Sequence, residues 1–240
     1  MKKRNVFIIG STGSIGQNTI RVCENLATEL SVIGLAARAS RTVLLEQAAR
    51  LYPRYAVLTD AESCTDLPRE LPKDCRCMEG EDGLVDAVCD PDVDIVLCAA
   101  SGTVGLKPVL AAIRAGKRIA LASKEILVMA GRIVTEEAAR HNVQILPVDS
   151  EHSAVFQCLR GINRDELKRV VLTASGGPFR GYSERDLKAV TYEEALGHPT
   201  WRMGNKITVD SATLANKGLE VIEAHWLFDA PPDMIAVVIH

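Results

Sequence analysis

Short apolar runs alternate with stretches of helical periodicity along the first 148 residues. The runs that predict strands are residues 5–9, 30–36, 55–58, 92–98, 118–122 and 144–148. Apolar positions spaced as in a helix predict helices through Ile20 to Leu26 and over residues 43–51, 106–115 and 125–141. Strands that alternate with helices predict a doubly wound parallel sheet, which binds its ligands outside the carboxyl ends of its strands.

Residues 60–83 follow neither pattern and contain Pro68, Pro72 and three cysteines, so we expect an irregular excursion there and assign it no function. The character of the chain changes again after Val148. Residues 153–159 predict a helix, and residues 167–173 and 234–239 predict strands. We therefore expect an α/β domain over residues 1–148 and an α+β domain over residues 149–240.

A glycine-rich turn follows the first apolar run directly and leads into the first helical pattern. Gly10, Gly13 and Gly16 have the spacing GxxGxxG. In a strand-turn-helix context, such glycines allow the backbone to approach a pyrophosphate, whose charge the helix N-terminus stabilises. The pattern favours a Rossmann-like dinucleotide site, and a glycine turn without a ligand is the alternative.

The second strand ends without the acidic residue that binds the ribose in NAD enzymes. Arg38, Ser40 and Arg41 stand there instead. Their positive charge and hydroxyl fit the 2′-phosphate of NADP, which favours NADPH over NADH. The alternative is that these are ordinary surface residues at the start of a helix.

Two carboxylates follow the apolar run at residues 144–148. In an extended segment, Asp149 and Glu151 would leave the same face and converge on one point. No cysteine or paired histidine stands nearby, so the hard oxygen ligands favour Mg²⁺ or Mn²⁺ over zinc. The alternative is a pair of solvated residues at the end of a strand.

Four further stretches carry candidate chemistry. Lys124 stands at the end of a predicted strand as a cation for an anionic substrate, or as a solvated helix cap. The loop 174–179 could wrap a phosphate with backbone N–H groups and Ser175, or be a plain glycine-proline turn.

Residues 198–206 could form a lid that excludes water, or a surface turn. On a helix, Asn216, Lys217 and Glu220 would share one face, either as a binding group or as an ordinary intrahelical pair. The glycine within this predicted helix, Gly218, suggests close packing or close approach of a ligand.

Composition excludes several classes of protein. The chain has 240 residues, 47% hydrophobic and 25% charged, with a net charge of -3, which gives no electrostatic surface for nucleic acid or an anionic membrane. The N-terminus lacks the pattern of a signal peptide, and the seven cysteines form no CxxC pair. These features predict a cytoplasmic protein that binds neither nucleic acid nor membranes.

Six motifs in order along the chain resemble those of the 1-deoxy-D-xylulose 5-phosphate reductoisomerase family. They are Gly10–Gly16, Ser123–Glu125, Val148–His152, Ser175–Phe179, His198–Gly204 and Val209–Glu220. The resemblance implies a NADPH-binding domain followed by a catalytic domain. It also implies a metal-dependent rearrangement of 1-deoxy-D-xylulose 5-phosphate and its reduction to 2-C-methyl-D-erythritol 4-phosphate, the committed step of a route to isoprenoids. It further implies a homodimer for the full-length protein.

The resemblance also assigns roles to individual residues. The metal ligands would be Asp149, Glu151 and Glu220, and the catalytic residues would be these three with Lys124 and His198. Contacts with the sugar phosphate would come from Lys124, Ser150, Glu151, Ser175, His198, Ser211, Asn216, Lys217 and Glu220. Trp201 and Met203 would close over the site. Cofactor contacts would come from Thr12, Gly13, Ser14, Ile15, Glu125 and Gly204. Further candidate cofactor contacts are Arg38 and Ser40, from the charge pattern after the second strand, and Ser123, which follows another strand end.

The chain departs from the family pattern in three places. Arg38-Ala39-Ser40 replaces a Gly-basic-Asn arrangement, and Ser123 stands where Asn is frequent. Family members continue beyond His240, so we expect a catalytic domain cut short, whose last strand lacks neighbours and which lacks the C-terminal helical domain. Two other functions stay open: another NADP-dependent reductase of a phosphorylated substrate, and a non-catalytic nucleotide-binding fragment.

Overall fold

The computed structural model describes residues 2–60, 67–197 and 204–240. The chain divides into two compact units, Met1–Val148 and Asp149–His240, which we call unit 1 and unit 2. Each unit has its own sheet.

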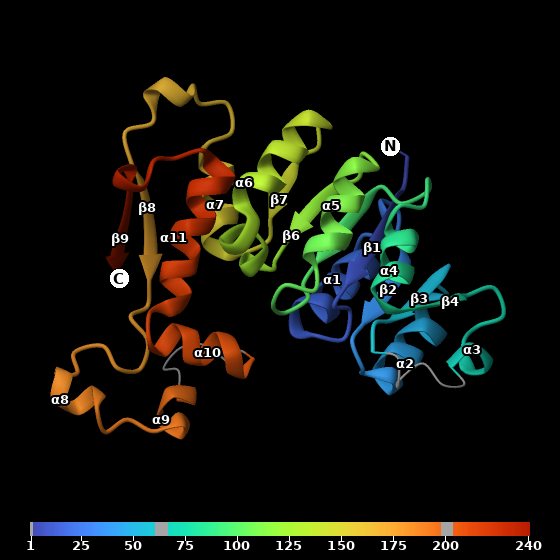
Figure 1. The fold of residues 1–240 in the computed structure, drawn as a ribbon, viewed down its shortest axis with the longest axis horizontal. Helices are drawn as coiled ribbons and strands as arrows, with labels where there is room; N and C mark the ends of the chain where they lie inside the picture. Colours follow the sequence, from blue (N-terminus) through green and yellow to red (C-terminus); the bar gives the residue numbers. More distant parts are fainter. Residues whose placement is uncertain (1, 61–66, 198–203) are drawn as a thin grey trace. The chain divides into compact units, whose positions relative to one another are not determined.

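Among the described residues, unit 1 forms a seven-stranded sheet in the order β4-β3-β2-β1-β5-β6-β7 (Figure 1). Its strands are β1 (Arg4–Ile9), β2 (Leu30–Ala37), β3 (Tyr55–Leu58), β4 (Arg76–Glu79), β5 (Ile95–Cys98), β6 (Arg118–Leu121) and β7 (Ile145–Pro147). Every neighbouring pair is parallel. The strand order reverses between β1 and β5, so the predicted doubly wound parallel sheet is confirmed.

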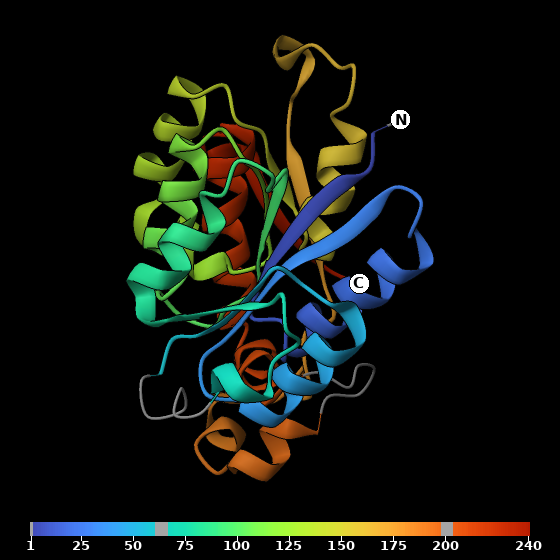
Figure 2. The ribbon, with the colours of Figure 1, turned by 90° about the vertical axis from the view of Figure 1, so that its right-hand side faces the viewer.

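Helices cover both faces of this sheet. They are α1 (Ser14–Asn25), α2 (Arg41–Leu51), α3 (Leu67–Glu70), α4 (Gly80–Val88), α5 (Leu106–Arg114) and α6 (Lys124–Arg140). Figure 2 shows α1 and α2 in blue on one side of the strands and α5 and α6 in green on the other. Because both faces are covered, the central strands are apolar over most of their length, and Phe7, Ile8, Leu35 and Leu58 are fully buried.

The prediction of an irregular excursion over residues 60–83 was wrong for the part that the structure describes. This part contains α3, the edge strand β4 and the start of α4. Strand β4 pairs with β3, but its first and last residues, Arg76 and Glu79, are exposed. A short edge strand with polar ends lacks the continuous apolar run by which buried strands are found in a sequence.

Unit 2 pairs a small parallel sheet with helices. Strands β8 (Val170–Ala174) and β9 (Ile235–Ile239) are in register from Val170 with Ile235 to Ala174 with Ile239. The helices are α7 (Ser150–Cys158), η2 (Arg164–Glu166), α8 (Glu184–Leu187), α9 (Tyr192–Leu196), α10 (Asn205–Ala212), α11 (Ala215–Phe228) and η3 (Pro232–Met234). The expectation that β9 lacks neighbours was therefore wrong, because β8 lies along one of its edges.

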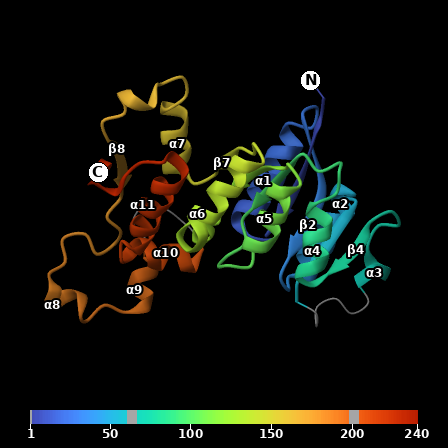
Figure 3. The same cartoon turned by 45° about the horizontal axis from the view of Figure 1, so that its top comes forward.

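Two helix predictions in unit 2 need correction. Helix α7 begins at Ser150, so Asp149 and Glu151 stand at a helix N-terminus and not in an extended segment. A carboxylate in the first turn of a helix is favoured by the unpaired N–H groups and the helix dipole. The stretch 208–220 is divided between α10 and α11 by Leu214, whose φ is 60° (Figure 3). A Cβ on Gly218 would meet no atom of the described residues within 4 Å, so close packing within the described part of the chain does not explain this glycine.

Two properties of the described residues bear on the environment of the chain. None of their helices combines the length and the apolar composition that a membrane-spanning segment needs. The described cysteines, Cys23, Cys75, Cys77, Cys89, Cys98 and Cys158, are free thiols.

Candidate metal and substrate site

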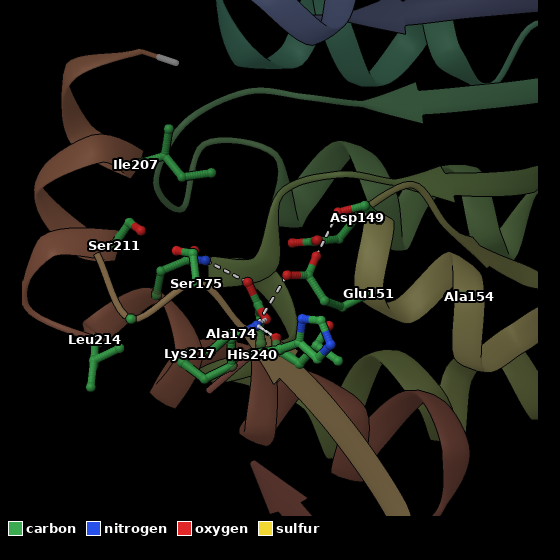
Figure 4. Close-up of a pocket in the computed structure, with 15 residues that line it drawn as sticks. Asp149, Glu151, Ala154, Ala174, Ser175, Ile207, Ser211, Leu214, Lys217 and His240 are labelled. Carbon is green, nitrogen blue, oxygen red and sulfur yellow. Dashed lines mark hydrogen bonds and ion pairs between the residues drawn. The ribbon is translucent and has the colours of Figure 1, made fainter. Parts of the chain in front are cut away.

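A cavity of about 780 Å³ lies in unit 2 where the ends of β8 and β9 meet α7, α10 and α11 (Figure 4). It brings together eight residues that the sequence predicted for a metal or a sugar phosphate. They are Asp149, Ser150, Glu151, Ser175, Ser211, Asn216, Lys217 and Glu220. These residues come from four separate elements and their connections, so their meeting is a property of the fold.

Three carboxylates form the centre of the cavity. Asp149 precedes α7, Glu151 lies in its first turn, and Glu220 lies on α11. One carboxylate oxygen from each lies within 4.8 Å of the others. Glu220 is only 1% exposed, which makes three negative charges at this spacing costly without a compensating cation.

Lys217 supplies one such cation. Its Nζ donates to Glu151 Oε1 at 3.0 Å, to Glu220, and to the Thr173 carbonyl at 2.6 Å. Asn216 donates to the other oxygen of Glu220. Lys217 is itself 7% exposed, so its charge is weakly screened by water. A single ammonium leaves the cluster with a net negative charge.

Glu151 is strongly biased towards its ionised form. Burial raises the pKa of its carboxyl, but hydrogen bonds from Ser150 and Lys217 and the charge of Lys217 outweigh that effect and lower the pKa to about 2. The Ser150 hydroxyl lies 2.5 Å from Glu151 Oε2. Glu151 is therefore a carboxylate at neutral pH, which is the form that coordinates a metal.

The donor set fits a hard divalent cation. It consists of carboxylate oxygens alone, and none of the described residues that line the cavity is a cysteine. Mg²⁺ and Mn²⁺ prefer such oxygen ligands, whereas zinc sites in proteins are built mainly from Cys and His. Asp149, Glu151 and Glu220 would hold the ion and leave positions for oxygen atoms of a substrate.

A buried histidine, to which the sequence analysis gave no role, lies next to the carboxylates. The His152 Nε2–H donates to the Glu220 carbonyl at 2.9 Å, and its Nδ1 lies 3.5 Å from Glu223 Oε2. Both side chains are fully buried, and the ring stacks on Phe228. His152 thus ties α7 to α11 next to two of the predicted ligands. Its position beside Glu151 was the available signal in the sequence.

The predicted phosphate loop follows β8. Gly176 and Gly177 have φ of +83° and +66°, so neither favours a residue with a side chain. A Cβ on Gly177 would lie 2.7 Å from the Ser211 carbonyl oxygen, so the loop passes close to α10. The Gly177 N–H points to Ser175 Oγ at 3.4 Å. Ser175 and Ser211 thereby line the same cavity.

The predicted pyrophosphate turn lies between β1 and α1 in unit 1. Gly10 has φ of +83°, and a Cβ on Gly16 would lie 2.2 Å from the Gly10 carbonyl oxygen. The turn therefore requires glycine at both positions. Helix α1 begins at Ser14, with Thr12 half-buried and Gly13, Ser14 and Ile15 exposed at its N-terminus.

The residues predicted to bind the 2′-phosphate lie where β2 leads into α2. Arg38 and Ser40 are exposed, and Ser40 is the residue before the first turn of α2. Arg41 forms an ion pair with Glu70 of α3. The segment that the sequence analysis left without a function thus contacts the start of α2.

The other predicted residues of unit 1 lie where β6 leads into α6. Ser123 is 4% exposed, and its hydroxyl donates to the Ala100 carbonyl at 2.6 Å, which holds the ends of β5 and β6 together. Lys124 and Glu125 form the first turn of α6, and Lys124 is 7% exposed. In unit 2, Gly204 precedes the first turn of α10. His198, Trp201 and Met203 lie outside the described residues.

Two family profiles match the chain. The profile of 1-deoxy-D-xylulose 5-phosphate reductoisomerase matches residues 6–131, and the profile of its C-terminal domain matches residues 145–228. A reductoisomerase of this name from Desulfosudis oleivorans is 50% identical over 239 residues, and one from Heliobacterium modesticaldum is 52% identical over 242 residues. Each match covers 99% of this chain, which spans 62% and 61% of those relatives.

Solved structures agree with these matches. A DOX-P reductoisomerase in complex with NADPH, fosmidomycin and magnesium superposes with a TM-score of 0.91 at 38% identity, over 99% of this chain and 61% of the other. The enzyme from Zymomonas mobilis in complex with NADPH gives a TM-score of 0.91 at 41% identity, over 99% of this chain and 62% of the other. The chain belongs to the 1-deoxy-D-xylulose 5-phosphate reductoisomerase family.

Proposed function

We propose that this chain carries out the NADPH- and metal-dependent conversion of 1-deoxy-D-xylulose 5-phosphate to 2-C-methyl-D-erythritol 4-phosphate. The observation that carries the proposal is the cluster of Asp149, Glu151 and Glu220 around Lys217, in the same cavity as the Ser175 loop. This cavity offers a site for a divalent cation and a site for a phosphate. Unit 1 adds the strand-turn-helix of a dinucleotide site.

At the metal end, Asp149, Glu151 and Glu220 hold Mn²⁺ or Mg²⁺. When bound, the ion polarises the substrate ketone and stabilises the negative charge that develops on its oxygen. Lys217 keeps Glu151 ionised and limits the repulsion between the carboxylates. Ser150 and Glu151 contact the hydroxyl groups of the substrate, and Lys124 is a further substrate-binding residue.

At the phosphate end, Ser175 and Ser211 donate hydroxyl hydrogen bonds from the β8 loop and from α10. The adjacent glycines allow backbone N–H groups to face an anion. Asn216 and Lys217 contribute an amide and a positive charge from α11. Anchoring the phosphate uses binding energy remote from the reacting carbons to fix their position in the site.

Most of the residues proposed for the cofactor lie in unit 1. We therefore propose residues 1–148 as the NADPH-binding domain and residues 149–240 as the catalytic domain. Thr12, Gly13, Ser14 and Ile15 receive the pyrophosphate at the N-terminus of α1, and Arg38 and Ser40 bind the 2′-phosphate. Ser123, Glu125 and Gly204 contact the cofactor. His198, Trp201 and Met203 cover the substrate during hydride transfer.

The test is oxidation of NADPH by the purified protein, supplied with 1-deoxy-D-xylulose 5-phosphate and Mn²⁺. We expect absorbance loss at the NADPH band that stops when a chelator is added and resumes with excess Mn²⁺. The same assay is run on a chain extended to the length of the relatives, because this chain spans about three-fifths of them. NADPH oxidation that continues after the chelator is added would contradict the proposal. The absence of NADPH oxidation by the extended chain would contradict it as well.

We also propose a cytoplasmic location and a homodimer in the full-length protein. Free thiols at the described cysteines suit a reducing compartment. The homodimer rests on the family resemblance, and light scattering of the extended chain tests it: a mass of one chain would contradict it.

A further inference from the structure

The end of β9 carries a histidine that none of the predicted roles includes. Strands β8 and β9 are parallel and in register, with Ala174 opposite Ile239. The His240 N–H donates to the Ala174 carbonyl at 2.9 Å, which continues the ladder by one residue. His240 therefore leaves the sheet beside Ser175, at the carboxyl end where ligands of parallel sheets bind.

The β9 end also packs directly on the phosphate loop. A Cβ on Gly176 would lie 3.0 Å from the side chain of Ile239. This close approach fixes the spacing between the loop and the residue after Ile239. The position of His240 is thus set by the same contacts that set the position of Ser175.

The His240 side chain lines the cavity of the site together with Ser175 and Lys217. Figure 4 shows its imidazole among the side chains of this cavity and not turned away from them. An imidazole carries at least one N–H donor in either charge state, and a phosphate oxygen is a strong acceptor. The three carboxylates approach the cavity from α7 and α11, whereas His240 approaches from the β8 side with Ser175.

We propose that His240 is a further substrate-binding residue, whose imidazole donates a hydrogen bond to the phosphate of the sugar phosphate beside Ser175. The proposal rests on the proposed function for the identity of that substrate. It assigns the end of β9 to the phosphate subsite, which is then built from two neighbouring strand ends and two helices. It predicts that losing this imidazole weakens substrate binding without changing the metal or cofactor sites.

The first test compares His240→Leu with the unaltered protein in the metal-dependent NADPH assay. We expect KM for the substrate to rise about 10- to 100-fold, the range for one hydrogen bond to a charged group, with kcat within about threefold. The dissociation constants of Mn²⁺ and NADPH stay unchanged. His240→Gln, which keeps an N–H donor, recovers part of the loss.

Val238→Leu is the matched control, because Val238 lies on the same face of the same strand, two residues before His240, and is 47% exposed. An equal rise of KM in this variant would overturn the proposal, since a disturbed strand would then explain both. An unchanged KM in His240→Leu would also overturn it.

The second test needs no turnover and uses inorganic phosphate as the probe. The chain has five histidines, so the imidazole resonances are few, and the His240 signal is identified by its loss in His240→Leu. We expect that signal to shift saturably as phosphate is added to the Mn²⁺-loaded protein. If the signal shifts but the protein lacks reductoisomerase activity, phosphate binding at His240 is supported and the proposed function is contradicted. If the protein is active, the His240 signal does not shift and KM is unchanged in His240→Leu, the proposed function stands and the proposed role of His240 is overturned.

Discussion

The two units use their buried positions differently. Unit 1 buries an apolar cluster that joins its sheet to α1 and α2 and includes Ile8, Leu35 and Leu58. The apolar cluster of unit 2 is small, with Val170, Leu172, Ala224, Phe228 and Ala230 as its buried members. Beside that cluster, unit 2 buries His152, Lys217, Glu220 and Glu223.

Unit 1 also buries charged side chains, Lys117, Lys124 and Glu137, so the two units differ in degree. Apolar burial stabilises unit 1 in proportion to area and does not depend on pH or ligands. Buried charges are favourable only while their partners are in place. The residues that build the site of unit 2 therefore also determine whether unit 2 is stable, and both properties should respond to the same substitutions.

The largest expected effect is the separation of turnover from cofactor binding. Asp149→Asn removes one of the three proposed metal ligands, and we expect kcat/KM to fall at least about 10³-fold, because a bound metal would stabilise developing charge. The proposed NADPH site lies in unit 1, so cofactor binding should stay nearly intact. Steady-state kinetics and a fluorescence titration with NADPH measure the two. Loss of cofactor affinity would contradict this division between the units.

Next in size is the loss of a buried polar contact in unit 2. Glu223→Ala removes the partner of His152 and leaves a cavity, and we expect the free energy of unfolding to fall by about 3 kcal/mol. Both tryptophans, Trp201 and Trp226, lie in residues 149–240, so tryptophan fluorescence follows the unfolding of unit 2.

The control is Leu58→Ala in unit 1, where Leu58 is fully buried. Deleting this side chain should cost about 2–5 kcal/mol in the transition seen by far-UV circular dichroism and leave the fluorescence transition in place. If Glu223→Ala and Leu58→Ala each shift the fluorescence and the circular dichroism transitions equally, the chain unfolds as one unit. The proposed difference between the two units would then be wrong.

Metal should stabilise unit 2 alone. At a free Mn²⁺ concentration of about 100 times its dissociation constant, binding adds about 2.7 kcal/mol to the free energy of unfolding of the unit that holds it. Hydrogen exchange should slow in α7 and α11 and stay unchanged in β1 to β3, and a chelator should reverse the change. Equal protection in both units would show that the site is coupled to the whole chain.

The smallest effect concerns a carboxylate of unit 1 that has only a structural role. Asp90 accepts hydrogen bonds from the Tyr55 hydroxyl at 2.5 Å and the Asp92 N–H at 2.8 Å, and it pairs with Arg54. Burial raises the pKa of the Asp90 carboxyl, but these contacts outweigh it and the pKa is lowered from 3.8. Asp90→Asn should cost about 1 kcal/mol at pH 7.

The pH dependence has a definite sign. Because the pKa of Asp90 is lower in the folded protein, its stabilisation is complete above 3.8 and is lost as pH falls below that value. Urea unfolding followed by circular dichroism should therefore show the difference between Asp90→Asn and the unaltered protein at pH 7 and a smaller one at pH 3. If the difference in the free energy of unfolding is the same at both pH values, the effect comes from altered packing and not from the charge of Asp90.

The sequence by itself determined the sheet of unit 1 and the residue types of the site. Strands buried on both faces are continuous apolar runs, and Gly10 and Gly16 mark a turn that no other residue fits, so both can be read locally. Carboxylates and a lysine at motif spacing predicted a metal and phosphate site at Asp149, Glu151, Lys217 and Glu220, and the structure brings these four residues into one cavity. The sequence did not predict edge strand β4, because its polar ends leave no apolar run.

Only the tertiary structure decided how the site is assembled. Asp149 and Glu151 converge with Glu220 because α7 begins at Ser150 and packs on α11, and not because the segment is extended. The buried contact of His152 with Glu223 and the placement of His240 beside Ser175 join residues more than 60 positions apart in the sequence. Local patterns record which face of an element is buried, whereas such contacts depend on which elements pack together, and that is settled only when the whole chain folds.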